Sequence, residues 1–170
     1  AYSIGVMQGV NRAITQVDYD LIVYTNGDFH KYTTADQEKY YVSLLGGSIT
    51  DGVIVVTPSA SEFTSTAPLV AIDPNTDSSS YPAILATNRD GALAVMQYLT
   101  DLGHQRIGFI EGRPTLMSSV RRHAGYKEGL ETAGIPYDSA LVQAGDYSKE
   151  TGVLSAHKLL SLPTPPTAIF

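Results

Sequence analysis

Residues 88–114 read NRDGALAVMQYLTDLGHQRIGFIEGRP, a helical pattern that passes through a glycine into a continuous apolar run. Ala92, Val95, Met96, Leu99 and Leu102 recur every three or four positions, which is the period of an amphipathic helix. Gly103 is the expected end of that helix, and residues 107–110 form a short strand without polar interruption. A strand that is apolar throughout is typical of a parallel sheet with helices on both faces. The stretch therefore predicts an α/β fold.

The same alternation extends in both directions along the chain. Further helices are expected over residues 4–17, 34–45, 119–133 and 149–160, with Gly46-Gly47 ending the second of them. Further strands are expected over residues 21–24, 53–56, 69–72, 84–86, 141–144 and 167–170. Helices between apolar strands indicate parallel crossovers, so the chain is predicted to be doubly wound α/β.

The pattern restarts near Thr87, after the polar stretch of residues 75–80. A short echo supports two similar halves, because Tyr-Asp at residues 19–20 and again at 137–138 stands eight residues before Gly-Asp-aromatic. We therefore expect an N-terminal lobe over residues 1–88 and a C-terminal lobe over residues 89–170.

Composition excludes several classes of protein. The 170 residues include 11 Lys and Arg against 17 Asp and Glu, a net charge of −6, and no cysteine. Disulfides and cysteine-ligated metals are therefore excluded, and the acidic balance argues against a nucleic-acid surface on these residues. The longest apolar run, residues 53–56, is far shorter than the roughly 20 residues that span a bilayer.

The common motifs of enzymes and cofactor sites are missing from the sequence. It contains no phosphate-binding Gly-Lys-Ser/Thr loop, no Gly-x-Ser-x-Gly, no His-Glu-x-x-His and no Gly-x-Gly-x-x-Gly. The four histidines have no metal-ligand spacing, so neither a cofactor nor a metal is expected. An enzyme would have to use Asp28, Asp73 or Asp146, and no motif supports that hypothesis.

Ligands of open parallel sheets bind beyond the carboxyl ends of the strands. The side chains at those positions are Asn26, Asp28, Thr57, Ser59, Asp73, residues 113–122, Asp146 and Tyr147. Tyrosine is abundant, with 11 copies, and its ring can stack on the C–H face of a sugar. Arg121-Arg122-His123 is the one dense basic cluster in the sequence, and an arginine fork can hold hydroxyls or a carboxylate.

These segments together resemble a known family. The resemblance is carried by Asn88-Arg89-Asp90-Gly91-Ala92, by residues 99–112 with their Leu-Gly-His-x-Arg-Ile run, by Arg122-x-x-Gly-Tyr126, and by the segments at 133–136, 145–148 and 166–170. It covers essentially the whole chain, although the first half matches only diffusely. The chain resembles the effector-binding core of LacI/GalR-type bacterial transcriptional repressors.

The resemblance implies a periplasmic-binding-protein-like core whose two α/β lobes close on a small effector, often a sugar or a nucleoside-type metabolite. It implies no catalysis, a homodimeric cytoplasmic parent protein, and operator DNA bound by a separate helix-turn-helix domain. By similarity, the effector-contacting residues would be Arg122, Ser118, Tyr147, Asp73 and Tyr2.

The chain departs from the family pattern at both ends. The family core begins with a central strand ahead of the first helix and continues beyond Thr-Ala-Ile-Phe, so the sequence is expected to be a fragment with both lobes incomplete. An extracytoplasmic sugar-binding protein of a transporter is the alternative, because it keeps the same fold. A helix-turn-helix upstream of Ala1 would favour the regulator, and a signal peptide there would favour the transport protein.

Overall fold

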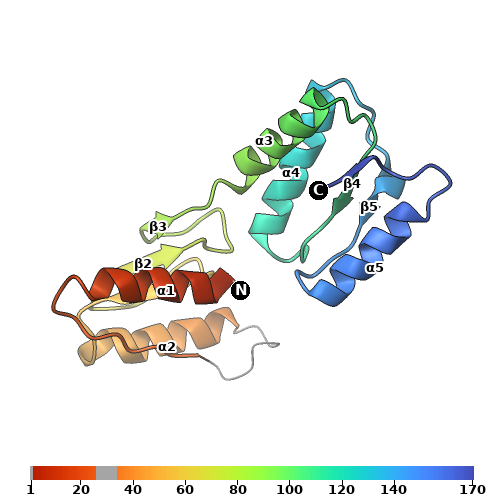
Figure 1. Cartoon of the computed structure of the whole chain (residues 1–170). Helices are drawn as coiled ribbons and strands as arrows, with labels where there is room; N and C mark the ends of the chain where they lie inside the picture. Colours follow the sequence, from red (N-terminus) through yellow and green to blue (C-terminus); the bar gives the residue numbers. More distant parts are fainter. Residues whose placement is uncertain (1, 26–33) are drawn as a thin grey trace. The chain divides into compact units, whose positions relative to one another are not determined.

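The computed structural model describes residues 2–25 and 34–170, and their packing forms two compact units (Figure 1). The first unit comprises Ala1–Ile72 and Ser78–Ala83, and the second comprises Asp73–Asp77 and Ile84–Phe170. The short segment Asp73–Asp77 therefore packs with the second unit although it directly follows a strand of the first. The predicted lobe boundary at residue 88 stays a prediction.

The first unit contains two helices and a three-stranded sheet. Its helices are α1 (Tyr2–Ile14) and α2 (Ala35–Ser48), and its strands are β1 (Val53–Val56), β2 (Leu69–Ile72) and β3 (Ala83–Ile84) in the order β1-β2-β3. Strands β1 and β2 are parallel, with Val53 opposite Leu69 and Val56 opposite Ile72. The predicted parallel strands at these positions are confirmed.

Helix α2 begins at a capping box and continues past its predicted end. The side chain of Thr34 accepts from the Gln37 N–H at 3.3 Å, while the Gln37 side chain accepts from the Thr34 N–H at 3.1 Å. The predicted end at Gly46-Gly47 is wrong, because the helix runs to Ser48. The Thr66 hydroxyl donates to the carbonyls of Gly46 and Gly47 at 2.9 and 2.8 Å, so these late helix carbonyls have partners.

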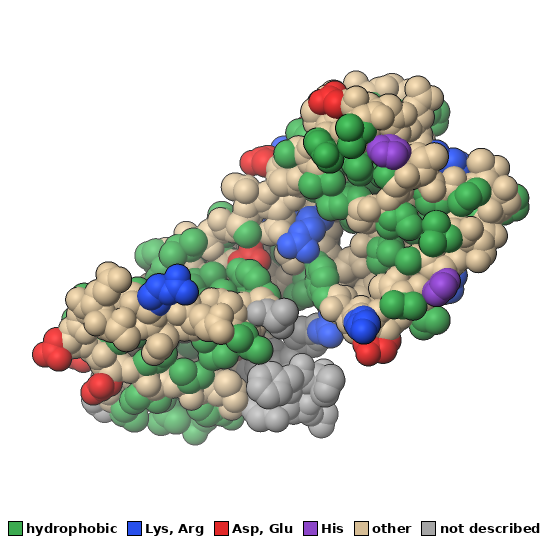
Figure 2. All heavy atoms as spheres, viewed as in Figure 1, with side chains coloured by type: hydrophobic (Ala, Val, Ile, Leu, Met, Phe, Trp, Pro, Cys, Tyr) green, Lys and Arg blue, Asp and Glu red, His purple; other side chains and the backbone are tan. Residues whose placement is uncertain are grey.

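The strand predicted at residues 21–24 is wrong for this structure. These four residues have no regular secondary structure, and their exposed fractions run from 39 to 62%. A strand is stabilised by a hydrogen-bonded neighbour, and no strand in the described ranges pairs with this apolar run. Helix α1 likewise buries none of its residues, and Figure 2 shows apolar side chains at the surface of this unit.

The second unit contains three helices and another three-stranded sheet. Its elements are α3 (Asn88–Asp101), β4 (Ile107–Ile110), α4 (Met117–Thr132), the short 3-10 helix η1 (Ser139–Leu141), β5 (Val142–Gln143), α5 (Lys149–Leu160) and β6 (Ala168–Ile169). The strand order is β5-β4-β6, with both neighbours parallel to β4. Helices α3 and α4 pack against each other, and α5 packs on β4 and β5 (Figure 1). The α/β prediction is confirmed.

Tyr126 of α4 is at the centre of the second unit's core. Its ring is fully buried and stacks on Phe109 of β4 with 4.8 Å between ring centres. Its hydroxyl donates to the Ile107 carbonyl at 2.9 Å, and burial raises the pKa of the phenol to about 12. Met96 and Leu130 belong to the same cluster. Tyr126 thus joins α4 to β4 through both a ring contact and a hydrogen bond.

Glycines set the helix ends and the spacing between α3 and α4. Gly103 and Gly134 follow α3 and α4 with positive φ, and both ends have the paired hydrogen bonds of a Schellman cap. At Gly125 a Cβ atom would lie 2.5 Å from the Arg89 carbonyl oxygen and 2.8 Å from the Ala92 Cβ. The two helices therefore approach as closely as they do because this position has no side chain.

No helix in the described ranges is long and apolar enough to cross a membrane.

Replacing Gly125 by alanine is expected to lower the free energy of unfolding by about 1–3 kcal/mol, because the added methyl meets backbone that cannot rotate away. Gly91→Ala is the matched control on α3, since a Cβ there meets nothing within 4 Å and alanine favours the helix. Urea denaturation measures both. Equal stability of the two variants would contradict the proposed close approach.

Candidate functional site

Two side chains of α4 and one from the loop after β5 meet beyond the carboxyl ends of β4 and β5. The hydroxyl of Tyr147, which follows β5, lies 2.7 Å from the Ser119 Oγ in the first turn of α4. One turn later, Arg122 donates from Nη1 to the same hydroxyl at 3.3 Å, and its guanidinium carbon lies 5.7 Å from the centre of the Tyr147 ring. The arrangement combines a cation with an aromatic face, which suits binding of a hydroxylated ring.

Backbone geometry presents the Tyr147 ring at the surface. Tyr147 has a φ of 69°, in the left-handed region, and is 55% exposed. Gly112, in the loop after β4, makes room for its phenol group. A Cβ at Gly112 would overlap the Tyr147 ring and lie 2.5 Å from the Ser119 Oγ. The observed packing therefore requires a residue without a side chain at this position. Strain at a residue that lines a surface loop is typical of binding sites.

The carboxylate of Asp146, beside Tyr147, hydrogen-bonds to residues at the start of α5. It accepts from the Ser148 N–H at 2.8 Å and from the Thr151 hydroxyl. These bonds, the Thr151 hydroxyl first, lower the pKa of Asp146 to about 2. Arg113 adds to the effect and donates from Nε to the Asp146 carbonyl at 3.1 Å. Such a group stays ionised at neutral pH and donates no proton, which argues against general-acid catalysis here.

The segment Asp73–Asp77 docks on the N-terminus of α4. Asn75 accepts from the Met117 N–H at 2.6 Å and donates to the Thr115 carbonyl at 3.0 Å. Helix α4 has no side-chain cap of its own, so Asn75 supplies one from 42 residues away. Asp77 adds an ion pair with Arg121 at 2.5 Å. The distant segment Asp73–Asp77 thus fixes the first two turns of α4.

Asp73 itself is buried and strained. It is 8% exposed and has a φ of 50°, and its Oδ1 atom finds no hydrogen-bond donor among the described residues. A buried acceptor without a donor is costly, so such a group is a candidate for contact with a ligand hydroxyl or N–H.

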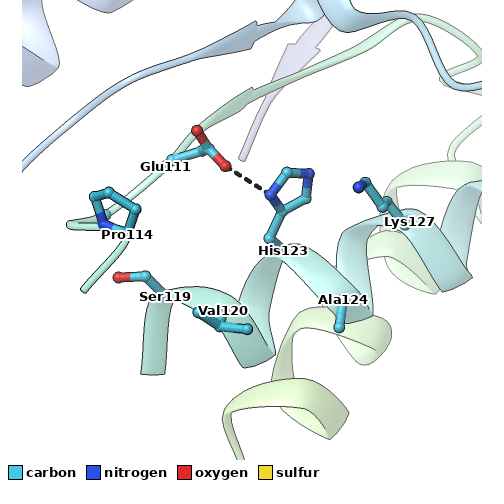
Figure 3. A pocket seen from close by; sticks show the side chains of 8 residues that line it. Glu111, Pro114, Ser119, Val120, His123, Ala124 and Lys127 are labelled. Atoms are coloured by element: carbon cyan, nitrogen blue, oxygen red, sulfur yellow. Dashed lines mark ion pairs between the residues drawn. The ribbon is translucent and has the colours of Figure 1, made fainter. Parts of the chain in front are cut away.

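A cavity of about 300 Å³ lies beside the loop after β4 (Figure 3). Its wall includes Glu111, Ser119, His123 and Lys127, and Figure 3 shows Glu111 and His123 facing each other. The His123 Nδ1 lies 2.6 Å from a carboxylate oxygen of Glu111, while its Nε2 is buried without a partner among the described residues. The His123 ring also packs on Phe109, with 5.4 Å between ring centres.

The structure brings only part of the predicted site together. Arg122 and Tyr147 are in contact, and the serine that contacts Tyr147 is Ser119. Ser118 is half-buried next to it on α4. The role of Ser118 as an effector contact stays a prediction. Tyr2 is the first residue of α1 and belongs to the first unit, so its part in the site stays a prediction. A helix turns 100° per residue, so the sequence alone could not tell which of two adjacent serines faces the loop after β5.

The remaining positional candidates have other surroundings. Asn26 and Asp28 lie outside the described residues. Thr57 has a positive φ of 52°, and the Ser59 N–H donates to the Glu38 carboxylate at 2.8 Å. Within the described residues, no group of three or more His, Asp or Glu side chains could hold a metal ion.

Replacing Thr151 by valine removes a hydroxyl that Asp146 accepts from, so the pKa of Asp146 is expected to rise from about 2 toward its ordinary value. Because the folded pKa is the lower one, stability from this carboxylate is present above the unfolded pKa and is lost as pH falls toward 2. NMR titration of the Asp146 carboxyl carbon tests this. An unchanged midpoint in Thr151→Val would show that the hydroxyl does not stabilise the carboxylate.

Asn75→Ala removes the long-range cap of α4 and is expected to lower the free energy of unfolding by about 1–2 kcal/mol. Thr76→Ala is a neighbouring control that keeps the cap. Amide hydrogen exchange should show faster exchange at Met117 in Asn75→Ala alone. Unaltered protection there would contradict the capping role.

Comparison with known proteins supports the fold and the family. The family described as periplasmic binding proteins and sugar binding domain of LacI family matches residues 1–170. A curated relative from Bacillus subtilis (strain 168), named Probable HTH-type transcriptional repressor ExuR, is 30% identical over 171 residues, covering 96% of this chain and 48% of that protein. The chain thus spans about half the length of the curated relatives it matches.

Solved structures show the same architecture. The transcription regulator CcpA of Lactococcus lactis has a TM-score of 0.74 at 22% identity, covering 99% of this chain and 62% of that one. A transcriptional regulator solved as a CelR–cellobiose complex has a TM-score of 0.58 at 26% identity, covering 75% and 41%. The relatives are named as repressors rather than enzymes, in agreement with the expectation of no catalysis. With two parallel α/β units and a family match over its whole length, the chain belongs to the periplasmic-binding-protein and LacI sugar-binding-domain family.

Proposed function

We propose that this chain is the effector-binding core of a LacI-type transcriptional regulator, and that α4 and the loop after β5 supply one wall of its effector site. The observation that carries the proposal is the pairing of Arg122 with the Tyr147 ring at a strand end. Within the part of the chain that the structure describes, Arg122 forms no ion pair, whereas its neighbour Arg121 is neutralised by Asp77. The Arg122 donors that do not contact Tyr147 are available to a ligand.

The chemistry of this wall favours a hydroxylated ring as the effector. An aromatic face stacks on sugar C–H groups, and an arginine fork donates to hydroxyls. Outside this wall, the Asp73 Oδ1 has no donor among the described residues, and we propose that it accepts from a ligand hydroxyl. The family description names sugar binding, and one related regulator was solved with cellobiose. A sugar or a related small metabolite is therefore the proposed effector class.

The regulatory role follows from the relatives. Because they are named as transcriptional repressors, we assign this core to a cytoplasmic homodimer in which a separate helix-turn-helix domain binds operator DNA. Effector binding would act by favouring one arrangement of the lobes over another, through a difference in affinity for the two. The related transport-protein role lacks this support from the curated relatives.

A thermal-shift screen tests the proposal with D-glucose, D-galactose, D-ribose, D-glucuronate, cellobiose and adenosine. At least one compound is expected to raise the melting temperature, because a ligand that binds only the folded state stabilises it. Failure of all six would contradict the proposed effector class.

For a compound that binds, Arg122→Ala is expected to weaken binding by about 1.5–3 kcal/mol, since it removes charge-assisted hydrogen bonds. Arg121→Ala is the matched control, because that arginine is adjacent on α4 but paired with Asp77. Isothermal titration calorimetry measures both affinities. Equal losses in the two variants would contradict a specific role for Arg122.

A further inference from the structure

The hydroxyl of Tyr147 has two neighbours at different distances. Its contact with the Ser119 Oγ is 2.7 Å, which is the usual length of an O–H···O bond. The contact from the Arg122 Nη1 is 3.3 Å, at the weak end of N–H···O distances. The serine is therefore the principal partner of this hydroxyl, and the arginine is secondary.

The chemistry of the three groups favours one direction for each hydrogen bond of the Tyr147 hydroxyl. A guanidinium can only donate, so the Tyr147 oxygen accepts from Arg122. A phenol is more acidic than a serine hydroxyl and is the better donor of the two. We therefore take Tyr147 as the donor to the Ser119 Oγ, so that the phenol both donates its proton and accepts a bond within the protein.

The surroundings of these groups differ sharply. Ser119 is only 5% exposed, whereas Tyr147 as a whole is 55% exposed. The hydroxyl end of Tyr147 therefore contacts a buried partner under the loop, and its ring faces outward. Gly112 leaves the space in which this contact forms, because any side chain there would displace both groups.

We propose that Ser119 is a positioning residue that holds the Tyr147 hydroxyl inside the protein, so that Tyr147 offers a ligand its ring face and not its hydroxyl. Tyr147 needs such a support because it follows a two-residue strand and has left-handed backbone, so no regular element fixes its side chain. Polar recognition at this wall then belongs to Arg122. The consequence for ligand choice rests on the proposed function, whereas the hydrogen bond does not.

The first experiment needs no ligand. The full chain is labelled with tyrosine carrying 13C at the ring carbon that bears the hydroxyl, and Tyr147→Phe assigns the Tyr147 signal among the 11 tyrosines. Ser119→Ala is expected to move that signal, because the chemical shift of this carbon reports the hydrogen bond of the hydroxyl. Ser118→Ala, next in sequence, is expected to leave it in place. An unmoved Tyr147 signal in Ser119→Ala, with the melting temperature retained, overturns the proposal.

The second experiment measures affinity for whichever of the six named compounds raises the melting temperature most. Ser119→Ala and Tyr147→Phe are each expected to weaken binding by about threefold to tenfold, and the double variant by no more than either alone. Additive losses would mean that the two hydroxyls act separately and would overturn the proposal. If none of the six compounds binds, the proposed function fails, while the carbon signal still decides whether Ser119 holds Tyr147.

Discussion

The close approach of α3 and α4 is the constraint on which the second unit depends. Gly125 and Gly129 face α3 without side chains, and a Cβ at either position would overlap that helix. On the sheet side, the Tyr126 ring stacks on Phe109 while its hydroxyl bonds to the Ile107 carbonyl. Helix α4 is thus fixed against a helix and against a strand by residues within one turn of each other. Interiors packed this tightly leave little freedom for a helix to slide or rotate.

The binding chemistry benefits from that rigidity. Arg122 and Ser119 lie one and two turns before the constrained positions on α4, so the helix sets the direction of both side chains. Asn75 fixes the first turn from outside by capping Met117. Tyr147 alone comes from irregular backbone, and it is the residue that the other two contact. An aromatic side chain on irregular backbone is therefore positioned by groups on a packed helix, as preorganised sites require.

The sequence predicts the elements of the second unit well because their signals are local. The apolar period of α3 and the glycines after α3 and α4 each act within a few residues of the element they define. The predictions fail where the stabilising partner is distant. Residues 21–24 have a strand-like pattern but no paired neighbour within residues 2–25 and 34–170, and α2 passes two glycines whose carbonyls accept from the Thr66 hydroxyl.

The site shows the same division between what is local and what is not. Residue type and strand-end position indicated Tyr147 and the pair Arg121-Arg122, and the family resemblance then distinguished Arg122. Ser119 and Asn75 are recognised only through contacts with residues 28 and 42 positions away.

Adjacent basic residues in a sequence are not equivalent once a helix forms. Arg121 and Arg122 differ by 100° around the axis of α4, so they point to different neighbours. One meets Asp77 at 2.5 Å, and the other meets the hydroxyl and ring of Tyr147. In an acidic chain with a net charge of −6, a neutralised arginine is the ordinary case, and its role here is to dock Asp73–Asp77 on the helix. Among the described residues, Arg122 is partnered by an aromatic ring and by no carboxylate, so its positive charge is not neutralised by them. The two arginines therefore differ in role because the helix turns them toward different partners, although both carry the same charge.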